Sequence, residues 1–164
     1  KALKIKPDFA EAYNNTGNAL ADKGDPAAAI DSVFGATNHD PVVLANVPFY
    51  SICEHHLLPF FGLAHLAYIP NGKIAGLSKL ARALDVACRQ LQVQERMTAQ
   101  VAEAIYSALD PDGVAVEVEA EHLCMSMRGV GKQNSFTTTS SMLGYFKQDP
   151  KTRAEFLGLI KLRA

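Results

Sequence analysis

One alternating run, 114–120 (VAVEVEA), constrains the fold of this chain more than any other stretch. Val114, Val116 and Val118 fall on one side of an extended backbone, and Glu117 and Glu119 fall on the other. Alternation with one apolar side is typical of a half-buried strand. The alternation continues through 121–128 (EHLCMSMR), so we expect one long strand that carries His122, Cys124 and Arg128 on a single face.

The rest of the chain after residue 41 alternates between strand patterns and helix patterns. β-branched and aromatic residues at 42–52 and 63–69 predict two more strands. Apolar residues recur every three or four positions at 78–91 and at 93–108, which predicts two helices. A last helix is expected at 149–163, with an apolar stripe formed by Phe156, Leu159 and Ile160. The sequence therefore predicts an α+β fold with two central helices.

The first 41 residues follow a different pattern, which resembles one tetratricopeptide (TPR) repeat, a two-helix unit of about 34 residues. The packing positions of such a repeat coincide with Tyr13, Gly17, Leu20, Ala29, Val33, Ala36 and Pro41. We therefore expect a helical hairpin at 1–41 and a separate domain at 42–164. A single repeat does not bury its own apolar face, so this segment would pack on the following domain, on further repeats, or poorly.

The composition is that of an ordinary soluble protein. Hydrophobic residues make up 48% of the chain, charged residues 20%, and the formal net charge is −1. Nothing therefore draws the whole chain towards nucleic acid or an anionic membrane, and no apolar run approaches the roughly 20 residues of a membrane span. Three cysteines without a signal peptide predict reduced thiols in the cytoplasm rather than a disulfide framework.

The run 53–56 (Cys-Glu-His-His) indicates a metal site. Cys53 and His56 are three residues apart, so in a turn or a helix both side chains can reach one ion. Cys124 adds a second thiolate, and two thiolates with one imidazole suit Zn²⁺. Cys88 lies on the packed face of a helix pattern and is expected to be an ordinary buried residue. Three protein ligands leave an open position, as in catalytic zinc sites, where the pKa of a bound water falls to about 7.

Two histidines stand next to these candidate ligands in the sequence. His55 and His122 have an ordinary pKa of about 6.5, which suits proton transfer at neutral pH. For His55, a position outside the site, in contact with a ligand or with solvent, stays open as an alternative.

Polar residues at the starts of the two central helices indicate a site for a ligand with an anionic part and a ring. The first helix start carries a hydroxyl and two cations beside free backbone N–H groups, a pattern that favours an anion: Ser78, Lys79 and Arg82. Arg128 could point at the same anion. At the second helix start, Gln94 and Glu95 pair an amide with a carboxylate, which suits an amidine-like N–H pair. Each of these residues alone is more often a solvated surface group.

Five motifs, taken in order, resemble the GTP cyclohydrolase I family. They are CEHHLLPFFGLAHLAYIPNG, GLSKLAR, LQVQERMT, EAEHLCMSMRGV and NSFTTTSSMLGYF, and the resemblance runs from about residue 25 to the C-terminus. It implies the tunnelling fold (T-fold), an α+β fold with an antiparallel sheet, in a homodecamer with active sites between subunits. It also implies the reaction, in which the imidazole ring of GTP is opened hydrolytically at C8, formate leaves, and the product recloses as 7,8-dihydroneopterin triphosphate.

Carried over to this chain, the resemblance assigns a role to each candidate residue. Zinc is expected on Cys53, His56 and Cys124, and proton transfer at His55 and His122. Guanine recognition is expected at Gln94 and Glu95, and triphosphate binding at Ser78, Lys79, Arg82 and Arg128.

The chain departs from the family pattern at its N-terminus. The family has a cation-bearing helix before the core, whereas residues 7–22 here contain no Arg or Lys. Each charge-assisted contact is worth about 1.5–3 kcal/mol, so we expect weaker triphosphate binding and a raised KM for GTP, or no activity if that helix also orders the subunit interface. Asn46 and Leu63 also stand where an acidic and a basic residue are expected.

Two other functions fit parts of the pattern. In a regulatory protein, the TPR-like segment would bind a partner, and the T-fold would hold zinc without turnover. A T-fold enzyme of the nitrile reductase branch would use a cysteine nucleophile and NADPH, but the paired histidines and the second cysteine at metal spacing speak against it.

Overall fold

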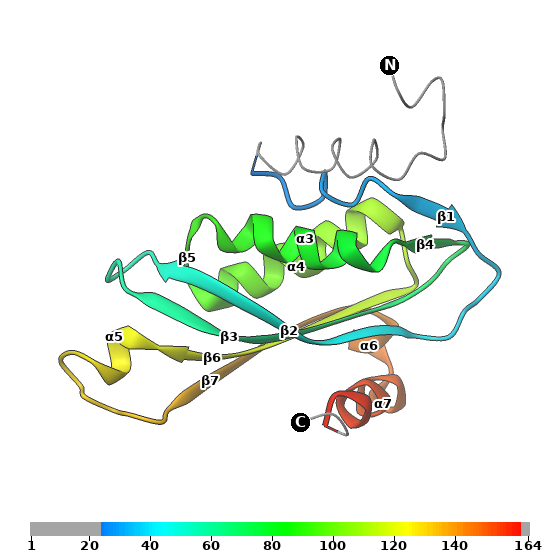
Figure 1. Cartoon of the computed structure of the whole chain (residues 1–164). Coiled ribbons are helices and arrows are strands. Elements are labelled where there is room, and N and C mark those ends of the chain that lie inside the picture. Colours follow the sequence, from blue (N-terminus) through cyan, green and yellow to red (C-terminus); the bar gives the residue numbers. More distant parts are fainter. Residues whose placement is uncertain (1–23, 162–164) are drawn as a thin grey trace, which may run out of the picture.

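A five-stranded sheet forms the centre of the molecule (Figure 1), and the computed structural model describes residues 24–161. The strand order is β5-β2-β3-β6-β7, and the neighbours are antiparallel except for β2 with β5. The strands are β2 (Val42–Cys53), β3 (Pro59–Ile69), β5 (Leu91–Gln92), β6 (Gly113–His122) and β7 (Phe136–Gly144). A separate two-stranded ribbon joins β1 (Val33–Gly35) to β4 (Lys73–Ala75). The strands predicted at 42–52 and 63–69 are therefore confirmed, and β3 begins four residues earlier than expected.

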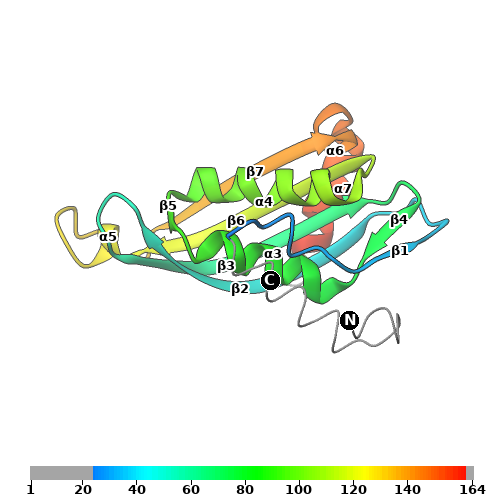
Figure 2. The same cartoon turned by 90° about the horizontal axis from the view of Figure 1, so that it is seen from above.

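Helices cover both faces of this sheet (Figures 1 and 2). The two predicted central helices are α3 (Leu77–Cys88) and α4 (Gln94–Leu109), which lie side by side along one face. The short α6 (Tyr145–Gln148) and the predicted C-terminal helix, α7 (Pro150–Lys161), lie against the opposite face at one end. Among the residues that the structure describes, no helix is both long enough and apolar enough to span a membrane.

The main core lies between the sheet and the pair α3 and α4. Val114, Val116 and Val118 are all fully buried there, as the alternation of β6 predicted, and they pack with apolar residues of both helices. Cys88 is also buried in this core, which confirms its expected packing role. The apolar stripes of both helices face the strands, and α3 is also covered by the segment that carries Ala29 and Ile30.

A smaller core lies on the other face of the sheet, under α6 and α7. Phe156 and Ile160 are buried there against Phe146 of α6. Leu159 was predicted to belong to the same apolar stripe, but its side chain is 39% exposed, so that part of the prediction is wrong. Phe156 and Ile160, four residues apart on one side of α7, are the residues that face the sheet.

The predicted strand 114–128 ends at His122, and residues 123–126 instead form a single helical turn, α5 (Leu123–Ser126). The prediction of one strand face shared by His122, Cys124 and Arg128 is therefore wrong. The reason is that β6 loses both neighbours at this point. Its last pair with β3 is His122 with Phe60, and its last pair with β7 is Glu121 with Phe136. Without a ladder partner the backbone N–H and C=O groups pair locally, and Met127 N–H donates to Leu123 O (3.0 Å).

The TPR-like hairpin predicted at 1–41 is not supported. Residues 1–23, which would hold its first helix, lie outside the described residues. Residues 24–41 hold a turn and strand β1 in place of the second helix. Ala29 and Ile30 are buried in the main core, so this stretch packs as part of the sheet domain. The domain boundary at residue 41 stays a prediction.

Candidate functional site

The loop between β2 and β3 brings Cys53 and His56 to one point. Cys53 N–H donates to Leu58 O (2.9 Å) and Leu57 N–H donates to Cys53 O (2.8 Å), so the loop closes on itself. Leu57 adopts the left-handed conformation (φ 54°) that this tight closure requires. Glu54 N–H also donates to Gln92 O (2.8 Å), which attaches the loop to β5. The turn-like backbone expected for the Cys-x-x-His pair is present.

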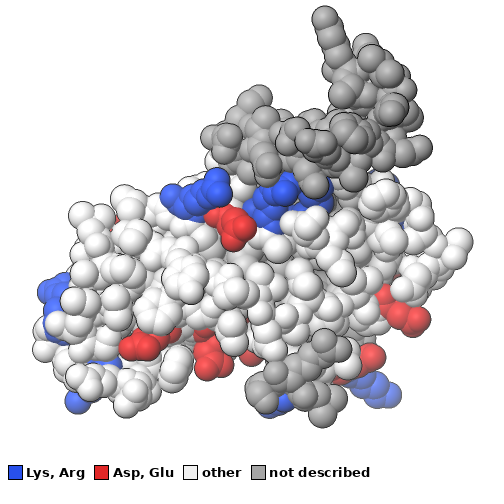
Figure 3. All heavy atoms as spheres, in the orientation of Figure 1, with Lys and Arg blue, Asp and Glu red and all other residues white. Residues whose placement is uncertain are grey.

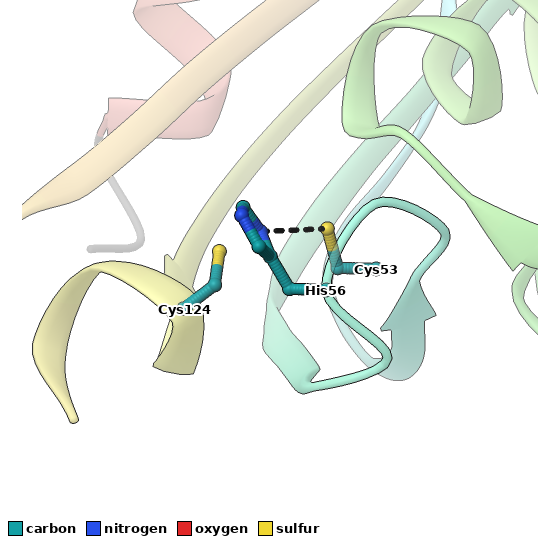
Figure 4. A group of neighbouring side chains, drawn as sticks. All are labelled: Cys53, His56 and Cys124. Atoms are coloured by element: carbon teal, nitrogen blue, oxygen red, sulfur yellow. Dashed lines mark hydrogen bonds between the residues drawn. The ribbon is translucent and has the colours of Figure 1, made fainter. Parts of the chain in front are cut away.

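The structure brings Cys53, His56 and Cys124 together, although they come from two separate segments (Figure 4). One potential ligand atom from each lies within 4.8 Å of the others, and Cys53 Sγ is 3.9 Å from His56 Nδ1. Cys124 reaches the cluster from α5, pointing back towards the loop. Cys53 is buried, whereas His56 and Cys124 are half-buried.

Electrostatics at the cluster favour a cation. Burial raises the pKa of the Cys124 thiol, and the neighbouring Cys53 raises that pKa further. Two adjacent thiolates are therefore disfavoured unless a positive charge lies between them. For His56, desolvation lowers the pKa, and the positive charges of His55 and Arg128 lower it too, so the imidazole stays neutral. A neutral imidazole and two deprotonated thiols are the forms that bind a metal.

This donor set fits zinc. Zn–S bonds of about 2.3 Å and Zn–N bonds of about 2.0–2.1 Å place tetrahedral ligand atoms between three and four ångströms apart. Ligand atoms within 4.8 Å of one another need only small movements to reach that arrangement. Because the chain offers three ligands here, a fourth position remains for water or substrate.

His122 is held beside the cluster by two contacts. Its ring stacks on Phe60, with centroids 4.6 Å apart and planes 2° from parallel. Its Nε2 is 2.7 Å from Gln94 Oε1. Burial lowers the pKa of His122, while the carboxylate of Glu95 raises it. A histidine with its plane and one nitrogen fixed presents its other nitrogen, Nδ1, in a defined direction.

The amide of Gln94 determines which nitrogen of His122 carries a proton. Gln94 Nε2 donates to Val118 O (3.0 Å) and Thr137 O (2.9 Å), two carbonyls that only accept. The amide orientation is thereby fixed, and Oε1 faces His122. Since Oε1 accepts, His122 Nε2 donates, and Nδ1 of the neutral ring is left as the acceptor.

Other predicted residues lie around the same cluster. Glu95 and Arg128 are exposed and close enough to influence His122 and His56 respectively. His55 is exposed, and its ring lies 4.1 Å from that of His56. Gln94, in contrast, is 1% exposed and its amide is fully engaged, so its side chain contacts His122 and the sheet.

Sequence reasoning missed Arg96, which joins the cluster loop to α4. Its guanidinium donates to Gln92 Oε1 (3.1 Å) and Leu91 O (2.8 Å) and forms an ion pair with Glu54. The available signal was weak, because an arginine two residues into a helix pattern is usually a solvated charge. Phe60 was also missed, since an aromatic residue in a strand is usually core.

Ser78, Lys79 and Arg82 are not brought to the cluster within one chain. Ser51 Oγ donates to Cys88 O (2.8 Å), which places the C-terminal end of α3 near the cluster loop. Nine residues separate Lys79 from Cys88, a rise of about 13 Å along the helix. The predicted anion group therefore lies at the far end of α3.

The fold and the cluster together define a class: an α+β protein with a three-ligand Cys-His-Cys site that suits a catalytic metal. Comparison with known proteins points to one enzyme family. The family model described as GTP cyclohydrolase I matches residues 4–161. The chain is 58% identical over 130 residues to GTP cyclohydrolase 1 of Methylococcus capsulatus, covering 79% of this chain and 70% of that protein.

Two further relatives give the same picture. GTP cyclohydrolase 1 of Deinococcus radiodurans is 56% identical over 131 residues, which cover 80% of this chain and 61% of that protein. The Coxiella burnetii protein of the same name (strain Dugway 5J108-111) is 54% identical over 136 residues, covering 83% of this chain and 74% of that protein. The chain belongs to the GTP cyclohydrolase I family and is a hydrolase of GTP.

A solved structure shows the likeness of fold alone. The archaeosine synthase QueF-Like in its apo form superposes with a TM-score of 0.50 at 18% identity, covering 63% of this chain and 93% of that chain. An α+β architecture with an antiparallel-rich sheet, as expected for the T-fold, is thus supported. The family match also includes most of the range 1–41 that was predicted to be a TPR-like hairpin.

Proposed function

We propose that Cys53, His56 and Cys124 hold a zinc ion, and that this centre opens the imidazole ring of GTP at C8. Formate then leaves, and the product recloses as 7,8-dihydroneopterin triphosphate. The observation that supports this most is the convergence of two thiols and one imidazole within 4.8 Å from the β2–β3 loop and α5. When bound, zinc supplies the Lewis acidity that lets a water lose its proton near neutral pH.

His122 is the group best placed to move protons at the reacting ring. Its Nε2–H is committed to Gln94 Oε1, so Nδ1 takes up or delivers the proton. Stacking on Phe60 and the bond to Gln94 hold the ring still, which keeps Nδ1 aimed at one point. His55, exposed beside His56, serves as a second proton carrier from solvent.

Glu95 and Gln94, at the start of α4, have different roles in this proposal. The guanine edge presents a ring N–H and an exocyclic amino group, and the exposed carboxylate of Glu95 can accept from both. Gln94 was expected to share this contact. We assign it to the positioning of His122 instead, because its amide already has partners.

The triphosphate would be bound by residues from two chains. Arg128 lies beside the cluster, whereas Ser78, Lys79 and Arg82 lie at the far end of α3. A second copy of the chain can place its own α3 start next to this cluster, which completes the site in a homo-oligomer, and the decamer of the family is the arrangement we propose. Arginine and lysine at a helix start bind phosphate through charge-assisted contacts and backbone N–H groups.

The decisive experiment incubates zinc-loaded protein with GTP and measures formate and the pterin triphosphate together. Cys124→Ala should abolish both products and lower the bound zinc. Cys88→Ala is the matched control, because it removes a thiol that is buried in the main core and is not one of the three clustered ligands. It should keep both zinc and turnover.

Each outcome has a separate meaning. Both products in equal amounts, lost only with Cys124→Ala, would support the proposal. Zinc bound without any product would contradict it and would favour a T-fold that has lost turnover. Formate without the pterin product would place the defect in reclosure.

A further inference from the structure

Residues 24–35, which we call the strap, run along α3 from one end to the other (Figures 1 and 2). At the C-terminal end, Gln90 Nε2 donates to Gly24 O (2.8 Å). At the N-terminal end, Gly76 N–H donates to Ser32 O (3.1 Å), and β1 pairs with β4. Ala29 and Ile30 anchor the middle of the strap in the main core. The strap is therefore packed and hydrogen-bonded as an integral part of the domain.

One carboxylate of the strap is paired with a residue that we assigned to the triphosphate. Asp31 Oδ1 is 2.7 Å from Lys79 Nζ, and the two side chains are 10% and 3% exposed. A buried ion pair is held more firmly than a surface pair, because neither charge is well screened by water. In the single chain Lys79 thus already has an anionic partner.

Two buried polar atoms, one on the strap and one on α3, lack a hydrogen-bond partner among the described residues. They are Asp31 Oδ2 and Arg82 Nη1. Arg82 lies one helical turn beyond Lys79, on the same side of α3. Figure 3 shows Lys and Arg side chains that gather over α3, with an acidic group among them, and the carboxylate of Asp85 lies close enough to feel the charges of Arg89 and Arg82. A buried donor without an acceptor is costly, so a phosphate oxygen at Arg82 would relieve that cost.

We propose that Asp31 is an internal competitor of the substrate triphosphate. It holds Lys79 in an anion-like contact while the site is empty, and the triphosphate has to replace its carboxylate at Nζ. The inference rests on the proposed function only in assigning Lys79 and Arg82 to the triphosphate. Asp31 thereby sets how tightly a polyphosphate binds, and it discriminates against ligands with too few negative charges to displace it.

The direction in which one substitution changes the affinity for the anion distinguishes a competing Asp31 from one that only positions Lys79. Asp31→Asn keeps the size of the side chain and an oxygen for Lys79 but removes the negative charge. If Asp31 competes with the anion, removing its charge lets the anion bind more tightly. If Asp31 only positions Lys79, the same substitution weakens anion binding. We expect the Kd for inorganic tripolyphosphate to fall on the order of tenfold.

The stability of the protein should change in the opposite direction. Removing one partner of a buried pair takes the Asp31 carboxylate away from Lys79, so we expect Tm to fall in the absence of ligand. Added tripolyphosphate then supplies the missing negative charge. The rise in Tm on adding tripolyphosphate should therefore be larger for Asp31→Asn than for the unaltered protein.

The test is made on the full-length chain in its native oligomer, by calorimetric titration with tripolyphosphate at fixed salt. Asp40→Asn is the matched control, an exposed carboxylate just before β2, and should leave the Kd unchanged. Lys79→Met should weaken binding. Asp31→Ser removes the same charge and leaves space for a water on Nζ, so it replaces Asp31→Asn if that variant does not fold.

Tighter binding by the Asp31 variants, with weaker binding by Lys79→Met, would support the inference. Unchanged or weaker binding by the Asp31 variants would overturn it, while the triphosphate assignment would stand on Lys79→Met. If Lys79→Met leaves the Kd unchanged, the inference fails together with that assignment. Formate release by the unaltered protein, measured separately, tells whether the proposed chemistry survives that failure.

Discussion

The two ends of α3 differ in how complete they are within one chain. At the C-terminal end, the cluster Cys53, His56 and Cys124 is gathered by a closed loop and a helical turn. At the N-terminal end, Lys79 and Arg82, which we propose for the triphosphate, lie apart from this cluster, and Lys79 is paired with Asp31 of the same chain. Among the described residues, the proposed metal site is therefore assembled within one chain, whereas the proposed anion site is not.

This difference follows from the cost of each charge. A cluster of two thiols and an imidazole can stay neutral until a metal arrives, so it can be gathered without penalty. Two cations close together in a partly buried place repel each other and lose hydration, so they need a counter-charge in the empty state. Asp31 provides that counter-charge for Lys79.

The largest effect should come from mixing two inactive variants. Cys124→Ala breaks the metal end, and Lys79→Met with Arg82→Ala breaks the anion end. If each site takes one end from each of two chains, hetero-oligomers formed from equal amounts should regain about a quarter of the unaltered turnover. The measurement is formate release after co-refolding. No recovery would show that both ends serve the same chain's site.

Gln94→Met should reduce kcat on the order of a hundredfold while metal binding persists. The substitution keeps the volume but frees His122 Nε2 and leaves Val118 O and Thr137 O without their donor. The lost hydrogen bonds should also cost about 2 kcal/mol in the free energy of unfolding. Tyr68→Phe is the control, since Tyr68 is equally buried and its hydroxyl accepts from Ala75 N–H (3.0 Å) at the opposite end of β3 from the cluster. An equal loss of kcat in both variants would refute the positioning role.

Arg96→Leu should weaken zinc binding by about tenfold, because contacts that orient metal ligands commonly contribute that much. Arg96 ties Glu54 of the cluster loop to Leu91 O and Gln92 of the neighbouring segment. Competition with a coloured chelator measures the zinc affinity directly. Arg153→Leu is the control, since Arg153 bonds the carbonyls of Phe146 and Lys147 beside α6. Unchanged zinc affinity in Arg96→Leu would show that Arg96 does not help to orient the metal ligands.

The smallest effect concerns Cys88 and alkaline pH. Burial raises its pKa from an ordinary 9.0 to about 12, with a further contribution from Asp85. In the unfolded chain the thiol loses its proton first, so unfolding releases a proton and stability falls as the pH rises from 9 towards 12. The stability advantage over Cys88→Ala should narrow by about 0.4 kcal/mol between pH 8 and 9 and by about 1 kcal/mol between pH 9 and 10, towards a limiting slope of about 1.4 kcal/mol per pH unit at higher pH. Urea titrations at pH 8, 9 and 10 measure it, and a constant difference would contradict the burial argument.

Strands and helices that repeat with a short, local spacing of side chains could be predicted from the sequence. Val114, Val116 and Val118 predicted a half-buried strand, and the three- and four-residue spacing predicted α3 and α4, because side chains repeat with the period of the backbone that carries them. The same local reasoning selected Cys53, His56 and Cys124, since a metal needs particular donor atoms whatever the fold.

Features that depend on neighbours distant in the sequence became visible in the folded chain alone. The alternation through Arg128 could not show that β6 loses its partners at His122 and that Cys124 turns back on α5. No sequence pattern marked the pairing of Asp31 with Lys79, or the amide of Gln94 turned towards His122. The end of a strand, a buried ion pair and a fixed histidine tautomer each depend on groups that come together only in the folded chain. A local sequence pattern therefore does not contain the interactions that stabilise them.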